Sequence, residues 1–215
     1  MQSPILLVAV AVTPVEFLAA AFFAFVSIVA FLLWVRAKGF RVEREMVEYA
    51  DKIGAVFHEE MSCEEFLKPF AAFELMNRFY RNRSTARRVV YPSDFGDIHL
   101  FFYQYADSPP GAPAGSFRCV TVLACRESFG IGHQIVSTNL WSKFVEAISA
   151  RKDTNNPLKK LIAKKRRCQL EVNESGTMLH FMTYIYQPKE IPRLVFEFTE
   201  LLRNMAQIAQ SAACE

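Results

Sequence analysis

Positive charge is absent from the beginning of the chain. Neither lysine nor arginine occurs before Arg36, and Lys38, Arg41 and Arg44 then follow within a few residues. A cleaved signal peptide has the reverse order, with cations before a shorter apolar core and small residues at the cleavage site. The order argues against a signal peptide. By the positive-inside rule, it predicts an outside N-terminus and a cytoplasmic C-terminal part.

Charge of either sign is absent from Phe17 to Val35, where Ser27 supplies the only hydroxyl. At 1.5 Å of rise per residue, a helix of this length matches a hydrocarbon core about 30 Å thick. A buried core helix of a soluble protein would need apolar neighbours on every side, so a transmembrane helix is the better interpretation. Ile5–Val12 is too short to cross and precedes Pro14, which predicts an interfacial stretch or an irregular extension of the span.

Motifs for metal, redox and nucleotide chemistry are also missing. The five cysteines, Cys63, Cys119, Cys125, Cys168 and Cys214, form no C-x-x-C pair. In a reducing compartment they are expected to be free thiols, and small buried residues explain them better than metal or redox chemistry. The glycines of Ser128–Gln134 lack the Lys-Ser/Thr of a phosphate loop, so a turn is expected there. We expect no cofactor and no metal.

Catalytic groups show no local signature. The four histidines, His58, His99, His133 and His180, are scattered along the chain, and paired carboxylates occur only in "HEEMSCEE". A half-buried imidazole in a strand and a solvated acidic helix face are the simpler interpretations. A Cys-His nucleophile stays open, because its partners need to be close only in space.

What the chain has in abundance is phenylalanine, with 20 residues, many of them outside the span. About 180 residues follow the span, enough for one ordinary domain with its own core. Val42, Met46, Tyr49, Ile53, Val56 and Phe57 recur at helical spacing, which predicts an amphipathic helix continuing from the span. Ser62 and Glu65 form a capping-box pattern for a second helix, which Pro69 either kinks or begins.

The composition then changes to β-branched and aromatic residues. "IHLFFYQYA" and "SFRCVTVLACRE" flank a Pro/Gly-rich loop, and "RRCQLEV" and "TMLHFMTYIY" flank "NESG", which predicts two hairpins. Apolar residues occur on both faces of the first strand, as expected for a central strand. Short helices are predicted at 140–150 and from Pro157, and a strongly amphipathic helix ends the chain.

These elements predict an α+β fold, with one N-terminal transmembrane helix followed by a cytoplasmic domain containing an antiparallel sheet of hairpins and flanking helices. The expected organisation is a tail and span at 1–35, juxtamembrane helices at 36–80 and the α+β domain at 81–215. The span would contact membrane lipid.

Two basic clusters are candidate contacts with lipid or a partner. Each precedes a predicted strand, and together they comprise Arg81, Arg83, Arg87, Arg88, Lys164, Lys165, Arg166 and Arg167. Solvated faces are the simpler interpretation, and attraction to the anionic inner leaflet is the functional one. Nucleic acid is the weaker alternative, because a pI near 8.6 is modest and no recognition motif is present.

The order of "IHLFFYQY", a Pro/Gly loop, "SFRCVTVLAC" and "LKKLIAKKRRCQLEVNESGTMLHFM" after a membrane helix resembles small bacterial single-pass membrane-anchored proteins of unknown function. The resemblance brings no activity and no site residues. Two hypotheses follow: a non-enzymatic membrane-tethered binding or scaffold module with an unidentified protein or lipid partner, or a membrane-associated enzyme of unrecognised class. A pocket holding His99 or His180 beside Cys119, Cys125 or an acid would favour the enzyme.

Overall fold

The computed structural model describes residues 14–58, 63–77, 81–106, 117–138, 156–163, 165, 167–182 and 184–213. The chain divides into two compact units, residues 1–43 and 44–215. The helix predicted at 140–150 and the candidate residues Lys164 and Arg166 lie outside the described residues.

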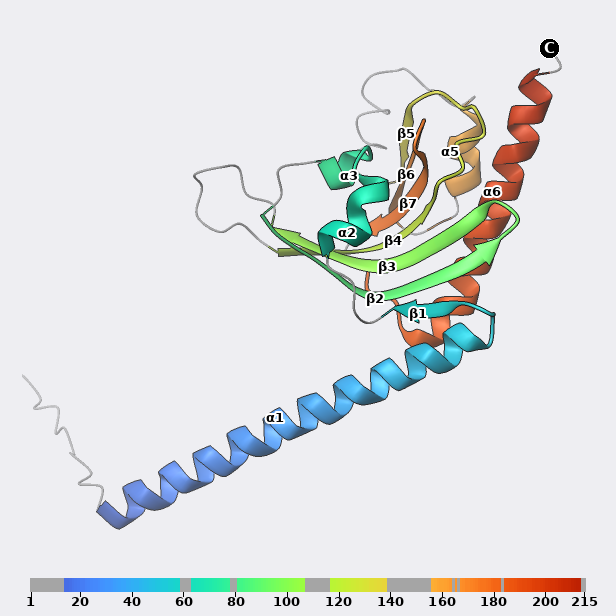
Figure 1. Cartoon of the computed structure of the whole chain (residues 1–215). Helices are drawn as coiled ribbons and strands as arrows, with labels where there is room; N and C mark the ends of the chain where they lie inside the picture. The colour runs from blue at the N-terminus through green and yellow to red at the C-terminus, as the bar shows by residue number, and fades with distance from the viewer. Residues whose placement is uncertain are drawn as a thin grey trace, which may run out of the picture. The chain divides into compact units, whose positions relative to one another are not determined.

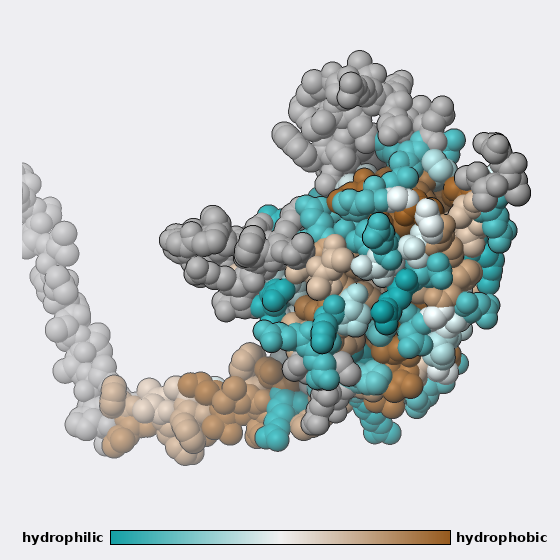
Figure 2. Space-filling view, turned by 45° about the horizontal axis from the view of Figure 1, so that its top comes forward, coloured by the Kyte–Doolittle hydropathy of each residue, from teal (hydrophilic) through white to brown (hydrophobic). Residues whose placement is uncertain are grey.

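The first unit is dominated by the first part of helix α1 (Pro14–Asp51). Of the described helices, α1 alone is long and apolar enough to cross a membrane, and no residue of its most apolar window is buried. Phe22, Phe23 and Trp34 are 64%, 69% and 58% exposed. In a core helix of a soluble protein, these apolar side chains would be buried. Figure 2 shows this run of apolar residues, whereas polar residues interrupt the surface of the second unit. The helix is therefore compatible with a single-pass membrane protein.

The helix ends within the second unit, where Met46 and Ala50 are fully buried. Gly54 has a φ of +71°, its N–H donates to Asp51, and the N–H of Ala55 donates to Ala50, which is a Schellman ending. The helical pattern predicted through Phe57 was therefore wrong. The chain turns at Gly54 and continues as a short strand.

Seven strands form one sheet in the order β1-β2-β3-β4-β7-β6-β5, and every neighbouring pair is antiparallel (Figure 1). The strands are β1 (Val56–His58), β2 (Arg81–Ser93), β3 (Gly96–Ala106), β4 (Phe117–Cys125), β5 (Gln134–Ser137), β6 (Cys168–Asn173) and β7 (Gly176–Met182). Both predicted hairpins, β3–β4 and β6–β7, are confirmed. The sheet extends beyond them through β1, β2 and β5.

One face of the sheet carries a continuous row of aliphatic side chains. The register aligns Val89, Leu100, Leu123, Leu179, Leu170 and Val136 across β2, β3, β4, β7, β6 and β5. The terminal helix α6 (Ile191–Ala213) buries Leu194, Phe198, Leu201, Leu202 and Met205. Tyr91 and Phe181, which lie on the same face as this row, line cavities together with α6. The predicted amphipathic helix is confirmed and covers this face.

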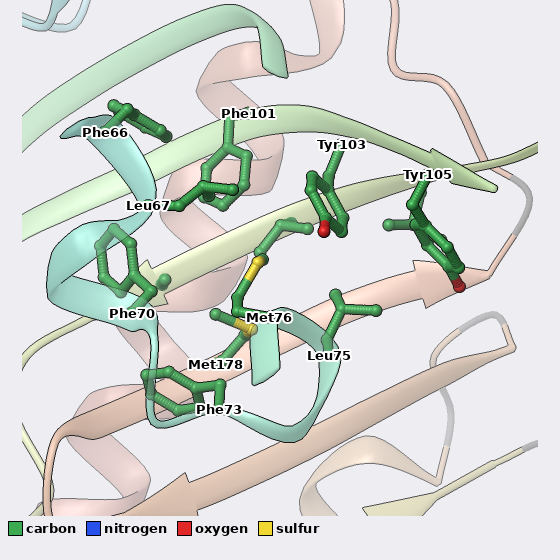
Figure 3. Packing of buried hydrophobic residues seen from close by; sticks show 13 residues of the cluster. Phe66, Leu67, Phe70, Phe73, Leu75, Met76, Phe101, Tyr103, Tyr105 and Met178 are labelled. Carbon is green, nitrogen blue, oxygen red and sulfur yellow. The ribbon is translucent and has the colours of Figure 1, made fainter. Parts of the chain in front are cut away.

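The opposite face is covered by three short helical turns: α2 (Cys63–Leu67), η1 (Lys68–Phe70) and α3 (Glu74–Asn77). Phe66, Phe70 and Met76 lie over Phe101 and Tyr103 of β3 (Figure 3). Phe66 and Phe101 meet edge to face, with ring centroids 4.9 Å apart. Covered on both faces, β3 is the central strand that its sequence predicted.

Proline positions explain two further boundaries. Pro69 lies in η1, so the predicted second helix is broken there into short turns rather than continuing to Tyr80. Pro157 is the first residue of α5 (Pro157–Ile162), and the side chain of Asn156 accepts the N–H of Leu158 as its cap. This start was predicted. A 3-10 turn, η2 (Pro188–Glu190), leads into α6.

Candidate ligand-binding groove along α6

A groove of about 570 Å³ runs beside α6, and its walls come entirely from the second unit. Three segments far apart in sequence form it: the turn after α1, the end of β2 and the outer side of α6. The lining residues are Ile53, Tyr91, Pro192, Arg193, Val195, Phe196, Thr199, Glu200 and Arg203. The groove is the largest of the three cavities considered below.

The sequence of α6 builds one wall. Pro192, Phe196, Thr199 and Arg203 are spaced by four, three and four residues, so they share one side of the helix. Phe196 is 66% exposed, although its neighbour Val195 is buried. Opposite them, the Schellman ending places Ile53, and β2 supplies Tyr91. Together with Ile53, Tyr91 and Val195, this ring gives the groove a largely apolar lining, which is common in ligand pockets.

Ion pairs surround the groove. Arg193 Nη2 lies 3.0 Å from Glu190 Oε1, Arg193 Nε lies 3.8 Å from Glu197 Oε1, and Arg203 pairs with Glu200. The side chains of Arg193 and Arg203 are about half exposed. Exposed pairs of this kind typically contribute only about 0–1 kcal/mol. The Arg203 guanidinium can therefore turn to a ligand at small cost, whereas Arg193 would first have to leave Glu190, whose side chain is 19% exposed.

The basic residues predicted as a contact surface have different surroundings. Arg81, Arg83, Arg87 and Arg88 lie within β2, not before the first strand as predicted. Arg83 is exposed and donates to the Met76 carbonyl, whereas Arg88 is 6% exposed, with its guanidinium 5.1 Å from the centroid of Phe66. Arg87 is tied to Tyr186. Among the described members of this cluster, the charges do not form one exposed patch.

The described members of the second cluster, Lys165 and Arg167, lie just before β6 in the same sheet. Lys165 Nζ is 3.0 Å from Glu197 Oε2, and Arg167 is exposed. β2 and β6 are separated by β3, β4 and β7, which corresponds to about 19 Å at the usual strand spacing. This exceeds the Debye length of about 8 Å. Binding of these residues to anionic lipid stays a prediction, and the two clusters are too far apart for their charges to act together.

Several residues with catalytic potential are buried or packed against aromatic rings. His180 and Cys125 are buried, and burial raises the pKa values of the Cys125 and Cys168 thiols. The ring of His99 packs against Phe66 and Phe70, and burial lowers its pKa. Two other cavities, of about 340 Å³ beside α5 and about 260 Å³ beside α2, are also present. Among the described residues, no histidine lines either of them or the groove.

A buried carboxylate was not predicted. Glu171 of β6 is 1% exposed, and both of its carboxylate oxygens accept the N–H of Glu74 at 2.9 Å. Burial raises its pKa, and the hydrogen bonds from Glu74 and Asn173 act in the opposite direction. His133 Nε2 lies 3.5 Å from Glu171 Oε1. The carboxylate holds the start of α3 against the sheet, which is a structural role.

Metal and disulfide chemistry can be assessed for the described residues only. Within them, no group of three or more His, Cys, Asp or Glu side chains could hold a metal ion. Cys63, Cys119, Cys125 and Cys168 are free thiols, as predicted, and Cys214 lies outside the described residues.

Comparisons with known proteins give no family: no family model, curated protein sequence or solved structure matches the chain.

Sequence reasoning missed the groove itself. Phe196 carried a local signal, because it lies outside the buried stripe of α6. Ile53 and Tyr91 carried none, since nothing in their own segments places them beside α6.

Proposed function

We propose that the chain is a membrane-anchored, non-enzymatic binding module that holds its ligand or partner in the groove along α6. The exposed ring of Phe196 on a groove of about 570 Å³ is the observation that carries this proposal. Ligand pockets are commonly concave, mostly apolar and between about 300 and 1,000 Å³. The groove has this character.

The anchor of the module is the apolar part of α1. Because cations follow the span and do not precede it, the proposed arrangement has the N-terminus outside and the α+β domain in the cytoplasm. A tethered domain meets membrane components at high local concentration, so a weak binding site suffices.

A binding role is favoured over an enzymatic one by the placement of the reactive groups. His99, His180 and Cys125 pack into the two cores, and the groove contains none of them. Its own polar groups are the hydroxyls of Tyr91 and Thr199 and three charged side chains, and among these described residues no nucleophile is paired with a base, as covalent catalysis requires.

Photo-crosslinking from the groove tests the proposal. Phe196 is replaced by photoreactive benzoylphenylalanine in the full chain in native membranes, and Phe117, which is 55% exposed on β4, is replaced in the matched control. We expect an adduct from position 196 that is absent from position 117. The same adduct should weaken when Tyr91→Ser alters the opposite wall. Equal labelling from both positions, or none from position 196, would refute the groove as a binding site.

A further inference from the structure

The dimensions of the groove restrict what can lie in it. It follows α6 from Pro192 to Arg203, which is about 17 Å at 1.5 Å per residue. The empty space of the groove, about 980 Å³ with the open mouth included, gives a mean width of about 9 Å over this length. An α-helix with side chains measures about 10–12 Å. A partner helix, or α6 of a second copy, could lie only across the mouth, whereas one extended chain fits inside.

The wall chemistry distinguishes a peptide from an alkyl chain. An extended peptide carries an N–H and a C=O at almost every residue, and these groups need partners when they are buried. The groove is walled mainly by Ile53, Tyr91, Val195 and Phe196, and no residue of β1, the edge strand, lines it. It therefore offers no strand edge for pairing. An alkyl chain needs only apolar contact.

The charged residues favour an acidic head on that chain. Arg193 and Arg203 lie near the two ends of the groove, and Glu200 is the single acidic residue that lines it. The guanidinium group has a planar fork of donors that matches a carboxylate with two parallel hydrogen bonds. Arg203 donates to Glu200, whose side chain is 41% exposed, so a ligand carboxylate can displace this acceptor. Arg193 donates to Glu190 of η2, whose side chain is 19% exposed, and lies 3.8 Å from Glu197, which is 40% exposed.

We propose that the groove along α6 binds a single-chain amphipathic carboxylate, a fatty acid, with its tail against Ile53, Tyr91 and Phe196 and its head on Arg193 or Arg203. This inference rests on the proposed function and names its ligand class. The membrane into which the chain is proposed to anchor is a natural source of such molecules.

A photoreactive fatty acid tests the inference. The full chain in neutral phosphatidylcholine nanodiscs is irradiated with diazirine-labelled palmitic acid, and adducts are mapped by mass spectrometry after trypsin digestion. Cleavage at Arg193 and Arg203 isolates Leu194–Arg203, which carries most of the α6 wall. Adducts in the apolar part of α1 report probe dissolved in the bilayer and serve as the internal reference. We expect labelling of Leu194–Arg203 that unlabelled palmitic acid suppresses and that hexadecanol, its uncharged analogue, suppresses about tenfold less well.

Variants sharpen the test. Phe196→Asp should reduce this labelling about tenfold, because a charge then faces the tail, while Phe117→Asp leaves it unchanged. Arg193→Gln combined with Arg203→Gln should remove the preference for palmitic acid over hexadecanol. Both tryptic sites are lost in this variant, so its labelling is measured on the longer peptide 190–215 and compared between the two competitors. Absence of labelling in Leu194–Arg203, or equal competition by acid and alcohol with the wild-type chain, would overturn the inference. A protein adduct from benzoylphenylalanine at position 196 would also overturn it while upholding the proposed binding function.

Discussion

Arg87 and Tyr186 are hydrogen-bonded to each other in both directions, although 99 residues separate them. Arg87 Nη1 donates to the Tyr186 carbonyl at 3.1 Å, and the Tyr186 hydroxyl donates to the Arg87 carbonyl. Arg87 has a φ of +53° at a bulge of β2, where its backbone leaves the ladder. The pair fixes the segment before α6 to the irregular part of β2, close to the strand end that supplies Tyr91.

Loss of the Tyr186 hydroxyl should therefore destabilise the domain. The ring is fully buried and burial raises the pKa of the phenol, so the group stays protonated and donates. Tyr186→Phe leaves the Arg87 carbonyl without this donor, at a cost of about 1–3 kcal/mol. Urea unfolding measures the difference, with Tyr49→Phe on α1 as the control. Equal midpoints for Tyr186→Phe and the wild type would contradict the role assigned to the bond.

Gly176 should tolerate no side chain. Its φ is +139°, and an added Cβ would lie 2.1 Å from the Cys125 carbonyl oxygen. Gly176→Ala is expected to cost on the order of 3 kcal/mol or more, because backbone must move in the β6–β7 turn. Gly132→Ala is the matched control, since nothing lies within 4 Å of its Cβ and its φ is not in the left-handed range. Thermal unfolding should separate the two variants clearly, and a similar loss in both would disprove the close contact.

Local sequence patterns predicted the elements that are determined by turn residues and by the spacing of apolar residues. The turn residues Asn173 and Gly176 identified the β6–β7 hairpin, and the spacing of apolar residues identified α6. β1 was missed because Val56 and Phe57 continue the helical spacing of α1. Only the left-handed conformation of Gly54 ends the helix before them.

The same local sequence patterns could not predict features that depend on contacts between distant segments. A glutamate in a strand indicates a solvent-facing position, and Glu171 is buried only because α3 covers that face of the sheet. Similarly, Ile53, Tyr91 and Phe196 meet in one groove because an antiparallel sheet and a terminal helix bring three distant segments together.

Glu171 should make stability depend on pH. Burial raises the pKa of this carboxyl above its ordinary value of 4.5, so the folded chain binds the proton more tightly than the unfolded chain does. Its contribution to the unfolding free energy therefore falls as pH rises from about 4.5 through the raised folded pKa. Glu171→Gln should remove this fall, so that the variant becomes more stable relative to the wild type as the pH rises from acidic to neutral.

Urea unfolding at several pH values measures that change, and exposed Glu174→Gln is the control. The comparison uses the difference between variant and wild type, because other groups titrate in the same range. If the unfolding free energy of the variant minus that of the wild type stays constant or falls as the pH rises, the buried carboxyl of Glu171 is not the source of the pH dependence.

The cations after the apolar stretch of α1 predict the orientation of the chain in a membrane. A reporter that is active only in the cytoplasm is expected to be active when it is fused after Glu215, because Arg36, Lys38 and Arg41 resist translocation. Protease added to intact cells should then leave the C-terminus intact. Digestion of the C-terminus by protease outside the cells would show that the orientation is opposite to the proposed one.

The two parts of α1 should differ in their importance for folding. Residues 17–35 contribute no buried side chain, whereas Met46 and Ala50 are fully buried in the second unit. A chain that begins at Arg36 should be soluble and unfold cooperatively in urea. A chain that begins at Lys52 loses the Met46 side chain from the core, and deletion of such a side chain typically costs about 2–5 kcal/mol. Near-ultraviolet circular dichroism and urea midpoints compare the two. Aggregation of the first would mean that the apolar stretch serves as protein core, and equal stability of the second would mean that the end of α1 is not part of the domain.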